Sequence, residues 1–279
     1  MSKLFRDARL KVQRANKHIA DLETAISVLK ENYTAIVVQN IDTGHQDLIH
    51  AIPDFAGAAD EMALIAGDAI HNLKTALDFA WMSTLRKHVP IANLDCAKFP
   101  VYPSRRELES ALNGVPINAR SNSALFELLV SDIQPFEGGH NGVIYVLHKL
   151  DICDKHLLLL GLVPLAGIDG IRVQRPDGET VRGFGGATQN LPPYVIPFDG
   201  NIRIKEKGRL TFHIVLKEAG IYGSVHIMEV LPTFSRVVSN YIGLLERIQI
   251  RTFLGEIVGG LTHVQFPAGF SLQAGGCLD

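Results

Sequence analysis

The sequence lacks several features that would assign it to a class at once. Its 279 residues include three cysteines, Cys96, Cys153 and Cys277, which form no C-x-x-C pair. This spacing argues against a disulfide framework and against a thiolate zinc cluster. No run of about 18 uncharged apolar residues is present to span a bilayer, and the first residues lack the apolar core of a secretory signal. We therefore expect a cytoplasmic protein without a membrane contact.

An excess of charge of one sign is also missing. Lysine and arginine number 27 and aspartate and glutamate 29, so the formal net charge is −2 and no overall positive field favours nucleic acid or anionic lipid. Apolar residues make up 47%, as in packed globular proteins. A local basic face remains on the first segment, formed by Lys3, Arg6, Arg14 and Lys17. A solvated face is its simplest explanation, and contact with RNA is a weaker one.

Apolar residues at steps of three and four predict a long N-terminal helix. Its stripe consists of Phe5, Ala8, Val12, Ala15, Ile19, Leu22, Ile26 and Leu29, and it packs within the chain or forms a homodimer seam. Further helices are expected at about 58–87, 105–112 and 121–133, and over VIYVLHKLDICDKH. The helix at 105–112 begins with a capping box, in which Ser104 precedes Glu107 by three residues.

Strand patterns occur in two places. TAIVVQN and QDLIHAI flank IDTGH, which predicts a hairpin at about 33–52. After His156 the expected strands are LLLLGLVPL, a hairpin in IRVQRPDGETVRGF, a second hairpin in RIKEKGRLTFHIVL, and the strand GSVHIMEVL. Pro232 then fits the first turn of a closing helix at 232–250.

This order of elements predicts an α+β fold. Residues 1–156 would form a helical bundle with one inserted hairpin, and residues 157–258 an antiparallel β-rich half with the closing C-terminal helix. No linker-like stretch separates the halves, so we expect one continuous fold. Residues 259–279 contain five glycines and little periodicity, which predicts a loosely ordered tail.

The stretch GDAIHNLKTALDFAW, residues 67–81, places short polar side chains on one helix face, namely Asp68, His71, Asn72, Thr75 and Asp78. A solvated face normally carries long, good helix formers such as Lys and Glu. Gly67 adds a cost of about 1 kcal/mol relative to alanine. The face is therefore a ligand site, a buried hydrogen-bond network or plain surface, in that order of preference.

A second polar cluster lies in LHKLDICDKH, and we expect it to meet the first across a helix pair. Asp154 projects toward the apolar side, where an unpaired carboxylate costs several kcal/mol, so we expect Lys155 or His71 to be its partner. His156 stands where helix gives way to strand. The candidate binding or network residues are Asp68, His71, Asn72, Lys74, Asp78, His148, Asp151, Asp154, Lys155 and His156.

No metal ligand, cofactor or catalytic residue is assigned from motifs. Asp68-x-x-His71 and His148-x-x-Asp151 place a carboxylate and an imidazole three residues apart, but metal-binding bundles use the longer Glu-x-x-His in pairs. Phosphate-loop, G-x-S-x-G and H-E-x-x-H motifs are missing. Metal-dependent hydrolysis is therefore only a third possibility.

Residues 55–160 resemble a family of uncharacterised bacterial proteins. GDAIHNLKTALDFAW, KFPVYPS, DIQPF and LDICDKH follow one another here as GD-x-x-HNLR-x-x-LDH, FP, an I-Q-P-aromatic segment and I-D-K-H do in that family. The family implies no established activity.

A more distant resemblance is to the HEPN class of helical-bundle ribonucleases. Their arginine and histidine, usually acting across a dimer, are similar in form to R-x-x-x-x-H within HNLR-x-x-LDH. This sequence has Lys74 and Phe79 at those two positions. Phenylalanine transfers no proton, and lysine lacks the bidentate fork of arginine.

Two functions from different classes follow. The first is a binding or interaction protein with a polar helix-borne site and no chemistry of its own. The second is an RNA- or phosphoester-directed enzyme, in a defence or toxin-like setting, with His71 or His156 as acid–base and Lys74 or Lys155 on the phosphate. The missing arginine and histidine favour the first.

Overall fold

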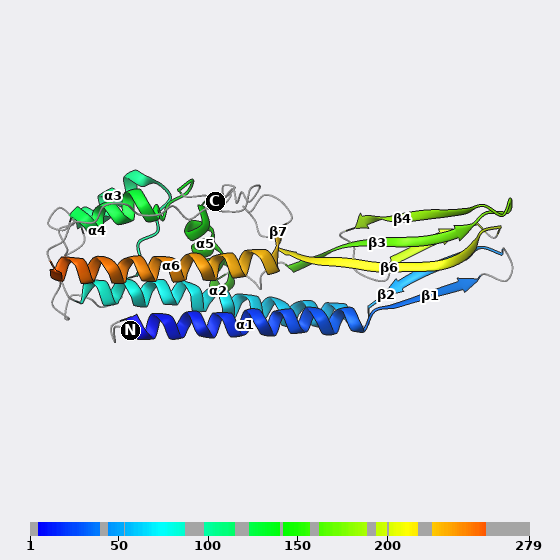
Figure 1. Ribbon diagram of the computed structural model, residues 1–279, viewed down its shortest axis with the longest axis horizontal. Coiled ribbons are helices and arrows are strands. Elements are labelled where there is room, and N and C mark those ends of the chain that lie inside the picture. Colours follow the sequence, from blue (N-terminus) through cyan, green and yellow to red (C-terminus); the bar gives the residue numbers. More distant parts are fainter. Residues whose placement is uncertain are drawn as a thin grey trace.

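Three long helices lie side by side at one end of the molecule, and two antiparallel sheets extend from the other (Figure 1). The computed structural model describes residues 5–39, 44–52, 54–86, 98–114, 123–139, 142–156, 162–188, 194–199, 201–216 and 225–254. The long helices are α1 (Arg6–Glu31), α2 (Phe55–Leu85) and α6 (Ile227–Leu254). The predicted α+β class is confirmed.

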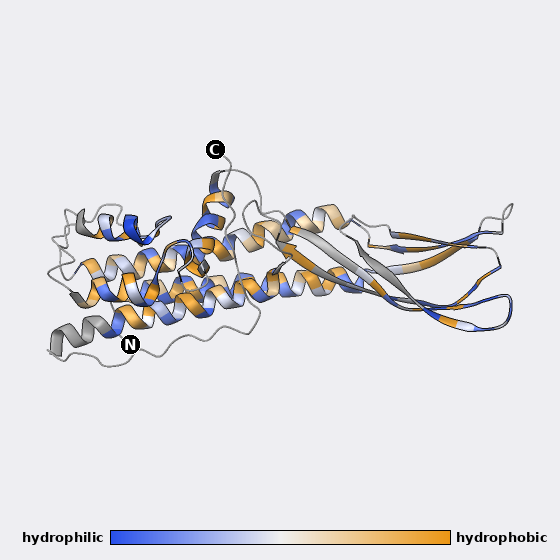
Figure 2. Ribbon diagram, turned by 90° about the horizontal axis from the view of Figure 1, so that it is seen from above, coloured by the Kyte–Doolittle hydropathy of each residue, from blue (hydrophilic) through white to orange (hydrophobic). Residues whose placement is uncertain are grey.

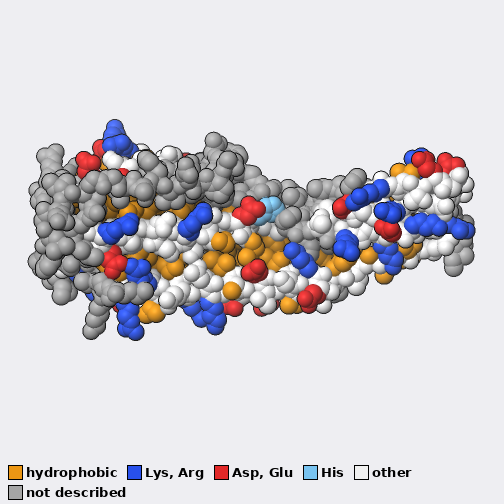
Figure 3. Space-filling model, viewed as in Figure 1, with side chains coloured by type: hydrophobic (Ala, Val, Ile, Leu, Met, Phe, Trp, Pro, Cys, Tyr) orange, Lys and Arg blue, Asp and Glu red, His pale blue; other side chains and the backbone are white. Residues whose placement is uncertain are grey.

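The bundle forms because each long helix buries an apolar stripe (Figure 2). In α1 the predicted stripe is buried, with Ile19 partly exposed at its edge. Along the bundle, hydrophobic side chains lie between the helices, and charged side chains are scattered over the surface (Figure 3). Burying each large apolar side chain stabilises the fold by about 1.5–3 kcal/mol.

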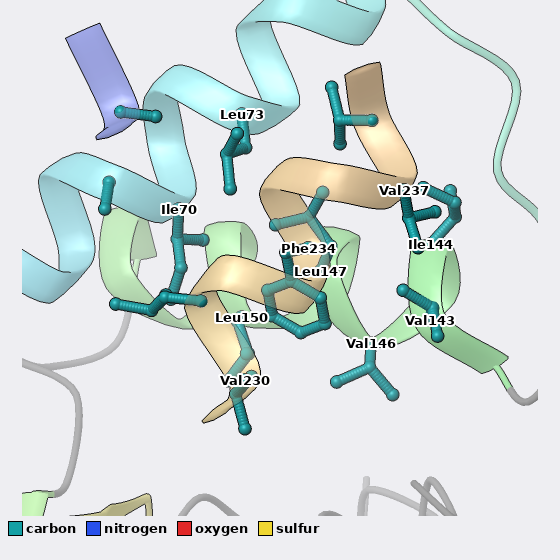
Figure 4. Close-up of a cluster of buried hydrophobic side chains, with 14 of the residues drawn as sticks. Ile70, Leu73, Val143, Ile144, Val146, Leu147, Leu150, Val230, Phe234 and Val237 are labelled. Atoms are coloured by element: carbon teal, nitrogen blue, oxygen red, sulfur yellow. The ribbon is translucent and has the colours of Figure 1, made fainter. Parts of the chain in front are cut away.

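Helix α5 (Val143–His156) packs across α2 and α6. Their shared core contains Ile70 and Leu73 from α2, five residues of α5, and Val230, Phe234 and Val237 from α6 (Figure 4). The shorter helices α3 (Arg105–Gly114) and α4 (Ser123–Glu127) lie nearby, and α4 continues into the π-helix η4 (Leu128–Ile133). The α5 core contact fixes which polar residues α2 and α5 present to each other.

The strands form two sheets. β1 (Thr34–Gln39) and β2 (Gln46–Ala51) make the predicted hairpin, and β5 (Tyr194–Phe198) joins them in the order β1-β2-β5. β3 (Leu162–Gln174), β4 (Thr180–Thr188), β6 (Arg203–Leu216) and β7 (Val225–His226) follow the order β4-β3-β6-β7. The predicted β3–β4 hairpin is confirmed by its register and by its turn at Arg175–Glu179.

The expected hairpin in RIKEKGRLTFHIVL is wrong, because these residues form the single strand β6. Gly208, the reason to expect a turn, has φ +76° but stays within the strand, opposite Gly170 with φ +77°. A Cβ at residue 208 would lie 2.8 Å from the carbonyl oxygen of Asp169. Glycine is therefore needed at residue 208 for a local backbone distortion inside a long strand, and the chain does not reverse its direction there.

The expected start of the closing helix at Pro232 is also wrong. β7 ends at His226, and α6 begins at Ile227, so Pro232 lies inside the helix. The buried side chains of Ile227, Val230 and Leu231 extend the apolar stripe upstream of the proline. Their burial outweighs a cost of about 3 kcal/mol for an internal proline.

Two expectations fall on residues outside the described ranges. They are the tail at 259–279 and the beginning of the apolar run at 157–161. Within the described part of the chain, none of the helices has both the length and the hydrophobicity needed to cross a bilayer.

Pro232→Ala should stabilise the protein. Pro232 is exposed, so the change loses no packing, while alanine restores an N–H donor for the carbonyl of Met228. We expect a gain of about 1–3 kcal/mol in the free energy of unfolding, measured in urea. The exposed Arg236, one turn later, gives the control Arg236→Ala, expected to change stability by less than about 0.5 kcal/mol. A less stable Pro232→Ala variant would contradict this account.

Candidate functional site

At Gly67 the carboxylate of Asp154 on α5 lies directly against the backbone of α2. A Cβ at residue 67 would lie 2.2 Å from Oδ1 of Asp154, so a side chain there must displace that carboxylate. The glycine inside α2 is therefore explained by the carboxylate seated against it. Asp154 and Gly67 are thus in contact where the predicted polar clusters meet.

His71 on α2 and Asp151 on α5 are joined by a hydrogen bond. The Nδ1 of His71 lies 3.0 Å from Oδ1 of Asp151, and the Nζ of Lys155 donates to Oδ2 of Asp151 at 2.7 Å. The Asp151 side chain is only 6% exposed, whereas that of His71 is 42% exposed. The prediction that Lys155 or His71 is the partner of Asp154 is therefore wrong, since both side chains bind Asp151.

Two further carboxylates, those of Asp68 and Asp154, lie near the His71–Asp151 pair. Asp68 is exposed and Asp154 is half-buried, and within the described part of the chain neither forms an ion pair. Burial, and then the Asp151 and Asp68 carboxylates, raise the pKa of Asp154, against the opposing effect of His71 and Lys155. The accessible side of the cluster thus carries surplus negative charge. We call Asp68, His71, Asp151, Asp154 and Lys155 the His71 cluster.

Lys74 and Asp78 form a separate, closed contact one to two turns further along α2. The Lys74 side chain is 4% exposed and donates to Asp78 Oδ1 at 2.5 Å. The same oxygen accepts the backbone N–H of Phe99 at 2.8 Å, and the Phe99 ring packs edge-on against Trp81. The Lys74–Asp78 pair therefore attaches the segment at Phe99 to α2. Because Lys74 is buried, its ammonium is not placed to contact the phosphate of a ligand.

His148 of α5 faces this closed contact. Burial first, and then the ammonium of Lys74, lower the pKa of His148 to about 4 against the opposing Asp151 and Asp78 carboxylates. Its Nδ1 is buried without a hydrogen-bond partner in the described structure. His148 is therefore a partly buried residue that is neutral at pH 7.

The other predicted residues lie elsewhere. Asn72 is buried against α1, where its Oδ1 accepts from Lys11 at 3.2 Å. The same ammonium lies 6.0 Å from the ring centre of Phe79, which is exposed. His156 ends α5, and its side chain is outside the described part. On α1, Arg6, Arg14 and Lys17 are exposed, and Lys3 is outside the described residues.

The motif segments that are separate in the sequence meet in the structure. Phe99 is bound to Asp78, Tyr102 donates its N–H to the Pro135 carbonyl at 3.1 Å, and Asp151 binds His71. The segments that contain Phe99 and Asp151 thus bind α2 directly, and the segment at Tyr102 binds the one at Pro135. Sequence reasoning missed the Phe99 amide and Lys11 as partners; only Gly67, an unfavourable residue inside a helix, gave a signal of a close approach.

Among the described residues no three His, Cys, Asp or Glu side chains gather as a metal site would require. Asp151 is already occupied by His71 and Lys155. The chemistry open to the cluster is that of an oriented imidazole beside carboxylates: hydrogen bonding, proton transfer and attraction of a cation.

Gly67→Ala should gain less stability than an ordinary helical glycine-to-alanine change, because its methyl group must displace the Asp154 carboxylate. Gly243 in α6 is a matched control, since a Cβ there meets nothing within 4 Å. Gly243→Ala should stabilise by about 0.5–1 kcal/mol. Adding Asp154→Ala to Gly67→Ala should recover stability, as a double-mutant cycle in urea would measure. Equal effects at the two glycines would refute the close approach.

Acid should weaken the fold through His148. The unfolded chain takes up this proton near the ordinary pKa of about 6.5, whereas the folded chain does so only near pH 4. The stabilisation is therefore complete above pH 6.5 and is lost as the pH falls toward 4. NMR titration of the His148 ring should give the lowered pKa, with the chain in urea as the reference. A folded-state pKa of 6.5 or higher would contradict the burial argument.

Comparisons with protein-family models, with curated proteins and with solved structures found no match. The resemblances to the family of bacterial proteins and to HEPN ribonucleases therefore stay predictions. What characterises this chain is its own geometry: a half-exposed imidazole held between α2 and α5 by a buried carboxylate.

Proposed function

We propose that the chain is a binding protein whose site is the His71 cluster, and that this site takes a positively charged group of a ligand or partner. The observation that carries the proposal is the pair of carboxylates, Asp68 and Asp154, beside the half-exposed His71. Neither has a cationic partner among the described residues, and Lys155 is engaged by Asp151.

Electrostatics favours a cation over an anion at this place. The pKa of Asp154 is raised in part by the neighbouring Asp151 and Asp68 carboxylates, which shows that these charges repel one another. A bound cation offsets that repulsion, and a phosphate adds to it. Because two packed helices hold the cluster, little ordering of the site is needed on binding.

An RNA- or phosphoester-directed enzyme is the second candidate. It is supported by the orientation of His71, whose Nδ1 is held by Asp151, and by the exposed Arg6, Arg14 and Lys17 on α1. The burial of Lys74 and the negative charge around His71 speak against it. Salt-dependent RNA binding would support this candidate, and no binding at low salt would count against it.

Tetramethylammonium should bind the wild-type chain and shift the NMR signals of the His71 ring. The double variant Asp68→Asn/Asp154→Asn removes the two unpaired charges and keeps the side-chain shapes. We expect its affinity to fall about fivefold, as a loss of about 1 kcal/mol implies. Binding should also weaken in acid as the carboxylates become protonated, earliest at Asp154 with its raised pKa.

Two controls separate site binding from general charge effects. tert-Butanol has a similar shape without charge and should leave the His71 signals unchanged. Asp21→Asn/Glu23→Gln removes two exposed charges from α1 and should keep wild-type affinity. Equal affinity of both double variants for tetramethylammonium would reject the proposed site.

A further inference from the structure

We propose that Thr75, His71 and Asp151 form a catalytic relay that moves an acyl group from an ester to the Thr75 hydroxyl and then to water. The inference rests on the proposed function, because the ester binds at the same cluster, and it names the substrate class. The three side chains line up as hydroxyl, imidazole and carboxylate, with His71 in the middle.

The hydroxyl of Thr75 differs from four other hydroxyls on α1 and α2. Those of Thr24, Ser27, Ser83 and Thr84 each donate to the carbonyl four residues earlier, the usual state of a helical hydroxyl. The Oγ1 of Thr75 instead lies 3.4 Å from Nε2 of His71. A hydroxyl next to a base is the arrangement that activates a nucleophile.

The imidazole is oriented from its other side. With the proton on Nδ1, where the Asp151 carboxylate at 3.0 Å accepts it, Nε2 is the acceptor that faces Thr75. Lys155 holds the second oxygen of Asp151 at 2.7 Å and so acts as a positioning residue. Thr75 is partly buried, and the His71 side chain beside it is 42% exposed.

The reaction balances with water as the only co-reactant. The Oγ1 of Thr75 bonds to the ester carbonyl carbon while its proton passes to Nε2 of His71. The bond from that carbon to the alcohol oxygen then breaks, and the alcohol leaves with the proton from Nε2. Water attacks the acyl-threonine in the same way, with His71 taking its proton and returning it to Oγ1. The unpaired Asp68 and Asp154 favour esters that carry a positive charge.

The test uses the full chain with p-nitrophenyl acetate, which is neutral and reports the relay alone. We expect a burst of p-nitrophenol and an acetyl group on the peptide containing Thr75, identified by mass spectrometry. His71→Gln should slow acylation about 10²–10⁴-fold. Thr75→Val should abolish both signals, and Thr75→Ser should keep them. The matched control is Thr24→Val on α1, which should react as wild type.

Several outcomes would overturn the relay. They are acetylation of another residue such as Lys155, a burst unchanged in His71→Gln, or no acetylation in either the wild type or Thr75→Ser. The charge preference is tested separately with acetylthiocholine, whose KM alone should rise in Asp68→Asn/Asp154→Asn. Acylation without that rise retains the relay and rejects the cation site. Binding of tetramethylammonium without acetylation retains the site and rejects the relay.

Discussion

The contact of Asp154 with the backbone of α2 at Gly67 is the constraint on which the polar cluster depends. It lets α5 approach α2 closely enough for Asp151 to reach His71. A side chain at residue 67 would displace the Asp154 carboxylate from its place against α2. The apolar core of α2, α5 and α6 supplies the energy that holds this approach, because the half-buried carboxylate itself costs desolvation.

The polar face of α2 has two parts with different physical roles. Lys74 and Asp78 are bound to each other and to the amide of Phe99, so they connect a distant segment to the helix. His71 is bound on one side only and keeps a half-exposed ring next to Thr75. In the ion pair both charges are already engaged, while the oriented, accessible imidazole of His71 can bind a ligand or transfer a proton.

Charge separates the candidate functions more sharply than the fold does. An α+β chain with a helical bundle is compatible with many activities. The surplus carboxylates around His71 disfavour a phosphate and favour a cation, which is why the ester proposed for the relay carries a positive group. The basic side chains Arg6, Arg14 and Lys17 belong to another helix, α1.

Sequence alone determined the elements that depend on interactions between residues close together in the chain. The stripe of α1, the bounds of α5, the β1–β2 hairpin and the pairing of Ser104 with Glu107 follow from periodicity and short-range hydrogen bonding. Tertiary structure decided what depends on distant partners. Gly208 stays within β6 because β3 pairs on both sides of it, and α6 begins before Pro232 because its first turns are buried. Likewise, His71 binds Asp151 in place of Asp154 because the helix crossing, and not the spacing in either helix, sets which carboxylate meets the imidazole.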